Sequence, residues 1–151
     1  MRSVKFIRIK GLFRYLVLYV LKDKPLHGYG IMKKIDELLK IDYIPSPGIV
    51  YPTLQLLEDM GYIESENVGR RKIYRLTSKG KKVLNENINE VEELIMKAKY
   101  FRNLAKEIGL DELVDTIRYL ITNITSIPSD AKNKLKMHIQ EIVKTLKSLI
   151  K

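Results

Sequence analysis

The stretch from Ser46 to Thr77 constrains the fold of this chain more than any other part of the sequence. Ser46 and Pro47 are favoured at the N-cap and first position of a helix. A serine hydroxyl can accept from an unpaired backbone amide there, and a proline loses no hydrogen bond. Gly61 is typical of a helix end. Between them, apolar residues recur at helical spacing and define a broad side facing a core: Ile49, Val50, Leu54, Leu56, Leu57 and Met60.

The other side of this predicted helix carries small and polar residues. Tyr51 and Gln55 can hydrogen-bond to a phosphate or a base edge, whereas Gly48 and Pro52 leave room for a ligand to approach closely. Pro52 also removes one helical hydrogen bond and predicts a kink. The two acidic residues at the far end of the helix would repel phosphate, so only its N-terminal half is expected to enter a groove of DNA.

A β-hairpin is expected directly after this helix. The segments Tyr62–Val68 and Lys72–Thr77 are rich in β-branched and aromatic residues and are separated by a turn that begins at Gly69. Its tip carries three consecutive cations, Arg70, Arg71 and Lys72. Such a run can be a merely solvated loop, but beside a helix that can bind phosphate a wing gripping the DNA backbone is favoured.

The charge balance supports a polyanionic partner. The 151 residues carry a formal net charge of +10 at pH 7, with a pI near 9.7. The first 80 residues hold 15 basic against 8 acidic side chains, and the rest hold 13 against 10. A membrane surface is the competing polyanion, but no stretch is long and apolar enough to span a bilayer and no signal peptide is visible. The absence of cysteine excludes disulfides and fits a cytoplasmic location.

The N-terminal residues allow several interpretations. Met1–Lys10 alternates basic and apolar side chains, as in a flexible arm on phosphate, a short strand, or the first turn of a helix packed on a partner subunit. Its many large apolar side chains favour packing slightly. Gly11–Leu21 is almost continuously apolar and is expected to form a buried helix. Another helix is expected from about His27 to Lys40. Its outer residue Lys33 is a candidate phosphate contact, although a solvated lysine is commoner.

The sequence offers little for catalysis or for cofactor binding. The triplet Gly28-Tyr29-Gly30 follows no predicted strand and lacks the third glycine of a nucleotide-binding loop, so it indicates close packing. His27 is interpreted as a capping or packing residue, because His138 is the only other histidine and cysteine is absent. No nucleophile pattern or zinc motif is present, and neither an enzyme nor a cofactor is expected.

Three motifs occur in a characteristic order and spacing. They are His27-Gly28-Tyr29-Gly30-Ile31, then Ser46-Pro47-Gly48-Ile49-Val50-Tyr51-Pro52 with Leu54, Leu57 and Glu58, and finally Arg71-Lys72-Ile73-Tyr74-Arg75-Leu76-Thr77 with Gly80. As a set they resemble the PadR family of transcriptional regulators over about the first half of the chain. The resemblance implies a winged helix-turn-helix with a C-terminal helical dimerisation region, which usually represses transcription and is sometimes released by a small ligand.

The resemblance also assigns residues. It places Tyr29, Ser46, Gly48, Tyr51 and Pro52 in the DNA-facing helices, and Arg70 to Lys72 in the wing. Two positions depart from the family pattern. Ile49-Val50 stands where Thr-Leu is common, which removes a polar contact. Gly30 stands where an acidic residue is common, so the pairing made by that carboxylate is absent.

The C-terminal half is expected to be helical and to pair two copies of the chain. One long helix is predicted from Lys79 to Ile108 and ends at Gly109, and another starts at Asp111 and is broken at residues 126–129. A last helix carries a heptad-like apolar seam. A bundle within one chain is the alternative, but a long helix leaving a winged domain buries its stripe poorly alone. The expected interface residues are Ile88, Val91, Ile95, Ala98, Phe101, Ile139, Ile142 and Leu146. Met96, Tyr100 and Phe101 can line an effector pocket, although plain core is their commoner role.

The sequence therefore predicts a mainly α fold with a small β-hairpin. A winged helix-turn-helix domain is expected over residues 1–80 and a helical dimerisation region over residues 81–151. The expected function is a homodimeric, sequence-specific transcriptional repressor, with a pseudo-palindromic operator in double-stranded DNA and an effector as an open option. A sequence-neutral DNA-binding or protein-interaction winged helix is the alternative. The predicted DNA contacts are Tyr29, Lys33, Ser46, Gly48, Tyr51, Pro52, Gln55, Arg70, Arg71 and Lys72.

Overall fold

The computed structural model describes residues 6–39, 45–123 and 126–149, with side chains from residue 11 onward. The chain divides into two compact units, Met1–Ala105 and Lys106–Lys151. The mainly helical class with a small β-sheet, expected from the sequence, is confirmed. The first unit contains α1 (Phe6–Val20), β1 (Leu26–His27), α2 (Gly28–Leu39), α3 (Pro47–Asp59), β2 (Ile63–Val68), β3 (Arg71–Leu76), α4 (Ser78–Glu86) and most of α5 (Ile88–Glu107), whose last two residues belong to the second unit.

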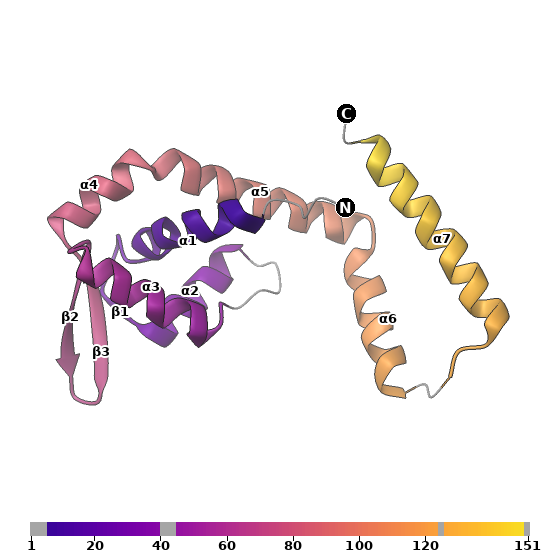
Figure 1. Ribbon diagram of the computed structural model, residues 1–151, viewed down its shortest axis with the longest axis horizontal. Coiled ribbons are helices and arrows are strands. Elements are labelled where there is room, and N and C mark those ends of the chain that lie inside the picture. The colour runs from indigo at the N-terminus through magenta and orange to yellow at the C-terminus, as the bar shows by residue number, and fades with distance from the viewer. Residues whose placement is uncertain (1–5, 40–44, 124–125, 150–151) are drawn as a thin grey trace. The chain divides into compact units, whose positions relative to one another are not determined.

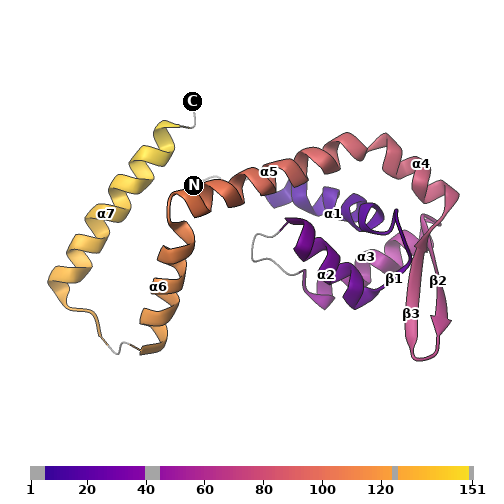
Figure 2. The ribbon, with the colours of Figure 1, turned by 180° about the vertical axis from the view of Figure 1, so that it is seen from behind.

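The core of the first unit forms around α1. Figures 1 and 2 show α1 between α4 and the adjoining part of α5 on one side and α2 and α3 on the other. This position explains the nearly continuous apolar sequence of α1, because a helix covered on several sides keeps no broad polar face. The buried side chains of the core are Phe13, Leu16, Val17, Leu18, Val20, Leu21, Ile31, Met32, Ile35, Leu39, Val50, Leu54, Leu57, Ile63, Tyr74, Leu84, Val91 and Ala98.

The end of α3 is a Schellman motif. The Gly61 N–H donates to the Glu58 carbonyl and the Tyr62 N–H donates to the Leu57 carbonyl, both at 2.9 Å. Gly61 has a φ of +70°, which glycine adopts without strain. The predicted helix stop at Gly61 is therefore confirmed, and the turn leads the chain directly into β2.

The sheet has three strands, where the sequence predicted two. Its order is β1-β3-β2, and both pairings are antiparallel. β1 consists only of Leu26 and His27, which pair with Tyr74 and Ile73 of β3. A strand of two residues is too short to show the alternation by which strands are recognised in a sequence. β1 ties the start of α2 to the hairpin.

The hairpin of β2 and β3 has a two-residue loop. Pairing runs from Ile63 opposite Leu76 to Val68 opposite Arg71, which leaves Gly69 and Arg70 at the tip. Gly69 has a φ of +62°, as the first position of a tight hairpin turn requires. The predicted hairpin and its glycine turn are confirmed.

Thr77 joins the base of the hairpin to α4. Its hydroxyl oxygen accepts from the Gly80 N–H at 3.0 Å and lies 2.7 Å from the carbonyl oxygen of Gly61 and 3.1 Å from that of Tyr62. Thr77 therefore caps the N-terminus of α4 with its side chain. Gly80 is needed here, because a Cβ would lie 1.9 Å from the Tyr62 carbonyl oxygen. α4 therefore packs directly on the backbone that enters β2.

The single long helix predicted from Lys79 to Ile108 is wrong, because the chain forms α4 and α5 there. The interruption is at Asn87, which has φ −121° and ψ 10°. The Asn87 side-chain amide donates to the Val83 carbonyl at 2.8 Å. An asparagine amide competes with backbone groups for helical acceptors in this way, and the helix ends.

The second unit contains α6 (Leu110–Asn123) and α7 (Ser129–Ser148). The break predicted at residues 126–129 falls between them, although residues 124 and 125 are outside the described part. None of the described residues of this unit, 106–123 and 126–149, is buried. Each helix therefore exposes its apolar stripe within the single chain.

Two further predictions meet the limits of the described residues. Residues 6–10 begin α1, as the helical interpretation of the N-terminus expects, whereas residues 1–5 lie outside the described residues, as does Lys40 at the predicted end of the second helix. Within residues 6–39, 45–123 and 126–149, no helix has the length and apolar character to cross a membrane.

Candidate functional site

The ten residues predicted to contact DNA are all exposed. Two lie on α2, four lie on α3, Ser46 immediately precedes α3, and three lie at or next to the hairpin tip. The exposed set thus comes from three consecutive parts of the first unit, as a winged-helix surface requires. The set is Tyr29, Lys33, Ser46, Gly48, Tyr51, Pro52, Gln55, Arg70, Arg71 and Lys72.

Tyr51 lies against the start of α2. A Cβ on Gly28 would be 2.7 Å from Tyr51 Cε1 and 2.9 Å from its hydroxyl oxygen. The Tyr51 ring therefore occupies the space that any other residue at position 28 would fill. This contact places the ring beside the N-terminus of α2 and gives Gly28 a packing role, as the glycine triplet indicated.

The same helix start orients a second aromatic residue. His27 Nδ1 accepts from the Gly30 N–H at 3.0 Å, which confirms the interpretation of His27 as a cap. The rings of His27 and Tyr29 are stacked, with centroids 6.3 Å apart and planes 8° apart. The Tyr29 side chain is 66% exposed. The capping histidine thus supports an exposed tyrosine on the same surface as Tyr51.

The start of α3 differs from the prediction in one respect. Ser46 is at the N-cap and Pro47 follows it in the first turn, but the Ser46 hydroxyl makes no capping bond. The predicted side-chain cap is wrong: Ser46 has the extended backbone that is usual at an N-cap, but only its carbonyl oxygen accepts, from the N–H groups of Ile49 and Val50. The hydroxyl is exposed and has no hydrogen-bond partner within the described residues. A hydroxyl left to bond elsewhere at a helix N-terminus suits an anion.

The middle of α3 constrains its two other candidate contacts. α3 runs from Pro47 to Asp59 with Pro52 inside it. The hydrogen bond that Pro52 removes therefore does not end the helix. The Gln55 amide donates to Asp59 Oδ1 at 2.8 Å. One of the two N–H groups of the Gln55 amide is therefore engaged by Asp59, and the other is the one that can donate to a base.

Two apolar residues of α3 are not on the core side. Val50, Leu54 and Leu57 are fully buried, as predicted, but Ile49 is 42% exposed and Leu56 is 50% exposed. The prediction that Ile49 and Leu56 widen the buried stripe is wrong. Val50, Leu54 and Leu57 alone form the face of α3 that packs on the core. Ile49 instead adds an apolar side chain to the exposed first turn of α3.

The three cations of the hairpin have different surroundings. Within the described residues, the side chains of Arg70 and Arg71 have no hydrogen bond or ion pair, whereas Lys72 Nζ lies 2.8 Å from Glu58 Oε2. The hydroxyl of Ser65 donates to the other carboxylate oxygen of Glu58. These bonds, first that from Lys72 and then that from Ser65, hold the pKa of the Glu58 carboxyl below its ordinary value. The bond to Glu58 in turn raises the pKa of Lys72.

Glu58 is the residue that sequence reasoning missed. It was expected only to repel phosphate, yet it joins α3 to both strands of the hairpin. Glu58 and Lys72 are 14 positions apart, so no helix or strand spacing links them in the sequence. A weak signal was present, because an acid at the end of a DNA-facing helix needs a cation beside it if phosphate is to approach.

The residues predicted for a dimer interface fall into two groups. Val91 and Ala98 are buried in the core of the first unit, and Ile88 and Ile95 pack against that core. Their apolar surface is therefore covered largely or wholly within one chain, and a contact with a second copy stays a prediction. The other four are about half exposed: Phe101, Ile139, Ile142 and Leu146.

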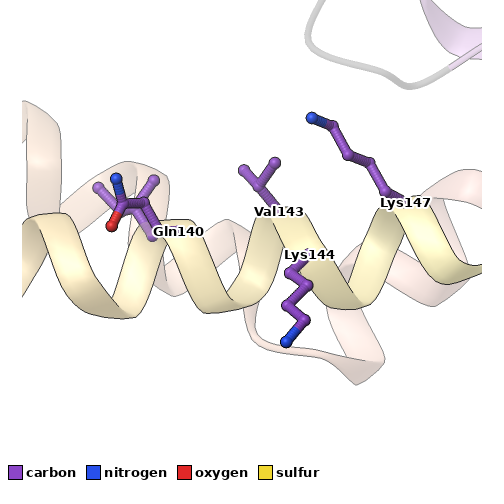
Figure 3. A pocket seen from close by; sticks show the side chains of 5 residues that line it. Gln140, Val143, Lys144 and Lys147 are labelled. Carbon is purple, nitrogen blue, oxygen red and sulfur yellow. The ribbon is translucent and has the colours of Figure 1, made fainter.

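α7 presents an open apolar surface. Figure 3 shows Gln140, Val143, Lys144 and Lys147 along this helix; together with Ile139 they line a shallow hollow. All five residues come from α7 itself, so no second element closes the hollow. Met96 and Tyr100 on α5, named as candidates for an effector pocket, are also largely exposed.

Comparisons with known proteins find a family and several related regulators. The model of the transcriptional regulator PadR-like family matches residues 17–86. The transcriptional regulator YqjI of Escherichia coli K12 is 39% identical over 83 residues, 54% of this chain and 40% of YqjI. The transcriptional regulator Rv3488 of Mycobacterium tuberculosis is 38% identical over 85 residues, 54% of this chain and 77% of Rv3488. A solved transcriptional regulator from Clostridium thermocellum has a TM-score of 0.54 at 25% identity, over 67% of this chain and 97% of the other.

The match to the family model lies within the first unit. Residues 17–86 run from α1 to the last residue of α4. The matched part spans only about two fifths of the length of YqjI.

Proposed function

Since this chain belongs to the PadR-like family of transcriptional regulators, we propose that its first unit binds double-stranded DNA at a specific sequence. The family consists of transcriptional regulators and not of enzymes. The observation that carries the proposal is the pair of exposed arginines, Arg70 and Arg71, at the tip of a hairpin held against α3; neither has a side-chain partner among the residues that the structure describes. Two guanidinium groups at the tip of a hairpin that is joined to the C-terminal end of α3 suit a DNA backbone.

The contacts divide into two classes under this proposal. Arg70, Arg71, Lys33 and the Ser46 hydroxyl bind phosphate, which positions the protein on the duplex. Tyr51, Gln55 and Tyr29 face base edges or sugars and supply sequence preference. Gly48 and Pro52 have small side chains, so the first turns of α3 can lie close to the DNA. Lys72 is left out of the phosphate contacts, because Glu58 already neutralises it.

We further propose that the chain acts as a homodimer and represses transcription. The seam of α7 is apolar at heptad spacing and about half exposed, and a second copy would cover it. A two-fold dimer places two wings on one duplex and predicts a pseudo-palindromic operator. On α7 the half-exposed seam consists of Leu135, Ile139, Ile142 and Leu146, and Leu149 just after the helix continues the spacing but is 76% exposed.

The central experiment measures binding of the full chain to its own upstream DNA and to scrambled DNA of equal length, at two salt concentrations. Preferential binding that survives the higher salt is expected, because base contacts do not depend on released counterions. Equal and salt-labile binding to both would contradict sequence specificity.

The wing is tested with Arg70→Ala and Arg71→Ala combined. The double variant should weaken binding to all DNA and lower the slope of log affinity against log salt by about 2, one for each lost phosphate contact. Lys81→Ala with Lys82→Ala removes the same charge from exposed positions on α4 and is the matched control. An unchanged slope in the arginine variant would remove the wing from the interface.

The sequence preference is tested at Tyr51. Tyr51→Ala should lose more affinity for the preferred site than for random DNA, by about 1–3 kcal/mol if the tyrosine reads a base. Tyr51→Phe separates the hydroxyl from the ring. Equal losses on both DNAs would show that Tyr51 contributes no specificity.

The dimer is tested at the centre of the seam. Ile142→Asp should give monomers in sedimentation equilibrium, because it places a charge on an apolar interface. Lys136→Asp, on the same helix and outside the seam, is the control. A dimeric Ile142→Asp variant would place the interface elsewhere.

One observation favours the alternative of a sequence-neutral DNA-binding protein. The Gln55 amide is engaged by Asp59, which leaves fewer free groups to read bases. Asp59→Ala would release Gln55, and a gain in preference for one site would argue against the neutral alternative.

An effector remains part of the proposal. The exposed Met96, Tyr100 and Phe101 on α5 offer an apolar surface for a small aromatic molecule. A compound that dissociates the DNA complex should lose that effect in Tyr100→Ala if this surface binds it.

A further inference from the structure

The carboxylate of Glu58 connects α3 to both strands of the hairpin. Its Oε2 accepts from Lys72 on β3 at 2.8 Å, and its Oε1 accepts from the Ser65 hydroxyl on β2. Each carboxylate oxygen therefore holds a different strand. The Glu58 side chain is 25% exposed, less than that of Lys72 at 45%, so the anion is the more enclosed member of the pair.

The register of the hairpin explains why both partners reach the same carboxylate. Ser65 is directly opposite Tyr74, and Lys72 precedes Tyr74 by two residues on the same strand. Residues in these relations share one face of a sheet. That face is turned toward α3, since both side chains bond to Glu58.

Tyr74 completes the surroundings of Lys72. The Lys72 ammonium lies 5.4 Å from the centroid of the Tyr74 ring, close enough for a cation–π contact. Tyr74 itself is buried in the core. The ammonium is thus held between a carboxylate on α3 and a ring anchored in the core.

The neighbouring cations lack such partners. Arg71 is adjacent to Lys72 in β3 and therefore points to the opposite face of the hairpin. Neither Arg71 nor Arg70 has a side-chain partner within the described residues. One basic cluster in the sequence thus contains two kinds of cation, of which only the arginines are free for phosphate.

We propose that Glu58 and Lys72, with Ser65, form a positioning clamp that sets the angle of the wing against α3, and that Lys72 acts through this clamp and not by binding phosphate. The proposal rests on the DNA-binding function proposed above. If the clamp sets that angle, the spacing between Tyr51 and the two arginines depends on an ion pair that touches no nucleotide. Glu58 is then a residue that determines specificity from outside the interface.

The chain offers a sharp test by charge exchange. Lys72→Glu and Glu58→Lys should each weaken binding to the preferred site by about tenfold. The exchanged double variant restores the ion pair with its polarity reversed and should recover most of that loss. If Lys72 contacted phosphate, its replacement by glutamate would place an anion on DNA, and Glu58→Lys would not repair it.

A second ion pair in the same hairpin supplies the matched control. Arg75 Nε lies 3.0 Å from Glu64 Oε1, joining β3 to β2 without reaching α3. Exchange of Glu64 and Arg75 alters charges in the same ribbon and is expected to leave affinity within about twofold. A similar tenfold loss in this pair would show that hairpin charge in general, and not the clamp, controls binding.

The salt dependence of binding shows whether Lys72 positions the wing or contacts phosphate itself. Lys72→Ala should weaken binding while leaving the slope of log affinity against log salt unchanged. A fall in the slope by about one would reveal a direct phosphate contact and overturn the proposal.

A measurement without DNA separates this proposal from the proposed function. Residual dipolar couplings of backbone N–H groups report the orientation of the hairpin relative to α3. Glu58→Gln should change the couplings of β2 and β3, leave those of α3 unchanged, and permit normal folding. Unchanged hairpin couplings would overturn the clamp. A wild-type chain that shows no preference among DNAs would contradict the proposed function, and the couplings would still decide the clamp.

Discussion

The apolar stripe of α3 is fully buried at Val50, Leu54 and Leu57, whereas the stripe of α7 is about half exposed along its length. The two helices have similar periodic spacing of large aliphatic residues. The difference is that α1 and α2 pack against α3, while no described residue of the second unit is buried. Periodicity therefore identifies the apolar face of a helix but not what covers it.

The largest effect is expected from a pair of identical truncations on the two stripes. Leu54→Ala should cost the first unit about 2–5 kcal/mol of unfolding free energy, because it leaves a cavity in a closed core. Leu146→Ala should cost the single chain less than about 1 kcal/mol, because its side chain is half exposed. Chemical denaturation over a range of protein concentrations measures both. Equal losses at high dilution would show that α7 has a closed core of its own.

A smaller loss is expected from a glycine in the first unit. Gly80→Ala should destabilise it by about 1–3 kcal/mol, since the new Cβ meets a backbone carbonyl that has no freedom to move aside. Gly11→Ala is the control: no atom lies within 4 Å of its Cβ position, and the helix should gain up to about 1 kcal/mol. Thermal unfolding separates the two. A tolerated Gly80→Ala would contradict the close contact between α4 and the start of β2.

Gly28→Ala should affect binding more than folding. Its Cβ would displace the Tyr51 ring, which is exposed and can swing outward, so the loss of stability should stay below about 1 kcal/mol. The preferred DNA should nevertheless bind about tenfold more weakly. Gly30→Ala is the control, since the nearest atom to its Cβ would be His27 Cε1 at an ordinary 3.5 Å. If both variants bind equally well, the position of Tyr51 does not matter for recognition.

The smallest effect is expected from low pH, which should weaken the ion pair that holds the wing against α3. The pKa of Glu58 is lowered in the folded chain, so the ion pair with Lys72 contributes fully above the ordinary carboxyl pKa. The contribution is lost as pH falls through the lowered value. No change is expected near neutral pH. Carboxyl chemical shifts of Glu58 and amide shifts of β2 followed over pH test this, and Glu58→Gln should remove the transition from β2.

Much of the first unit could be predicted from local signals. The start of α3 at Pro47, its end at Gly61, the hairpin turn at Gly69 and the cap at Thr77 each depend on one residue type and its neighbours. Such features need no knowledge of the rest of the fold. The exposure of the ten candidate contacts could also be predicted. Once the apolar stripes are assigned to a core, the remaining positions of these elements must face solvent.

The features that were missed depend on partners distant in sequence or on competition between bonds. The strand β1 exists only because β3 offers it an edge. The role of Glu58 depends on a hairpin whose orientation is set by tertiary packing. Asn87 ends α4 although the surrounding residues favour helix, because its side chain takes the Val83 carbonyl. Ser46 has the right type for a capping bond but an exposed hydroxyl that does not make one.

The shared hydroxyl of Thr77 has a consequence for how the first unit fluctuates. The same oxygen touches the carbonyl groups that follow α3 and accepts the amide that begins α4. Neither segment can detach without breaking bonds that hold the other, so the root of the wing and the start of α4 open together. Their amide hydrogens should exchange with solvent at similar, slow rates, while those near Gly69 exchange rapidly. The wing is therefore expected to have a rigid root and a more mobile tip, and under the proposed function this would let the arginines adjust to a phosphate backbone without disturbing the core.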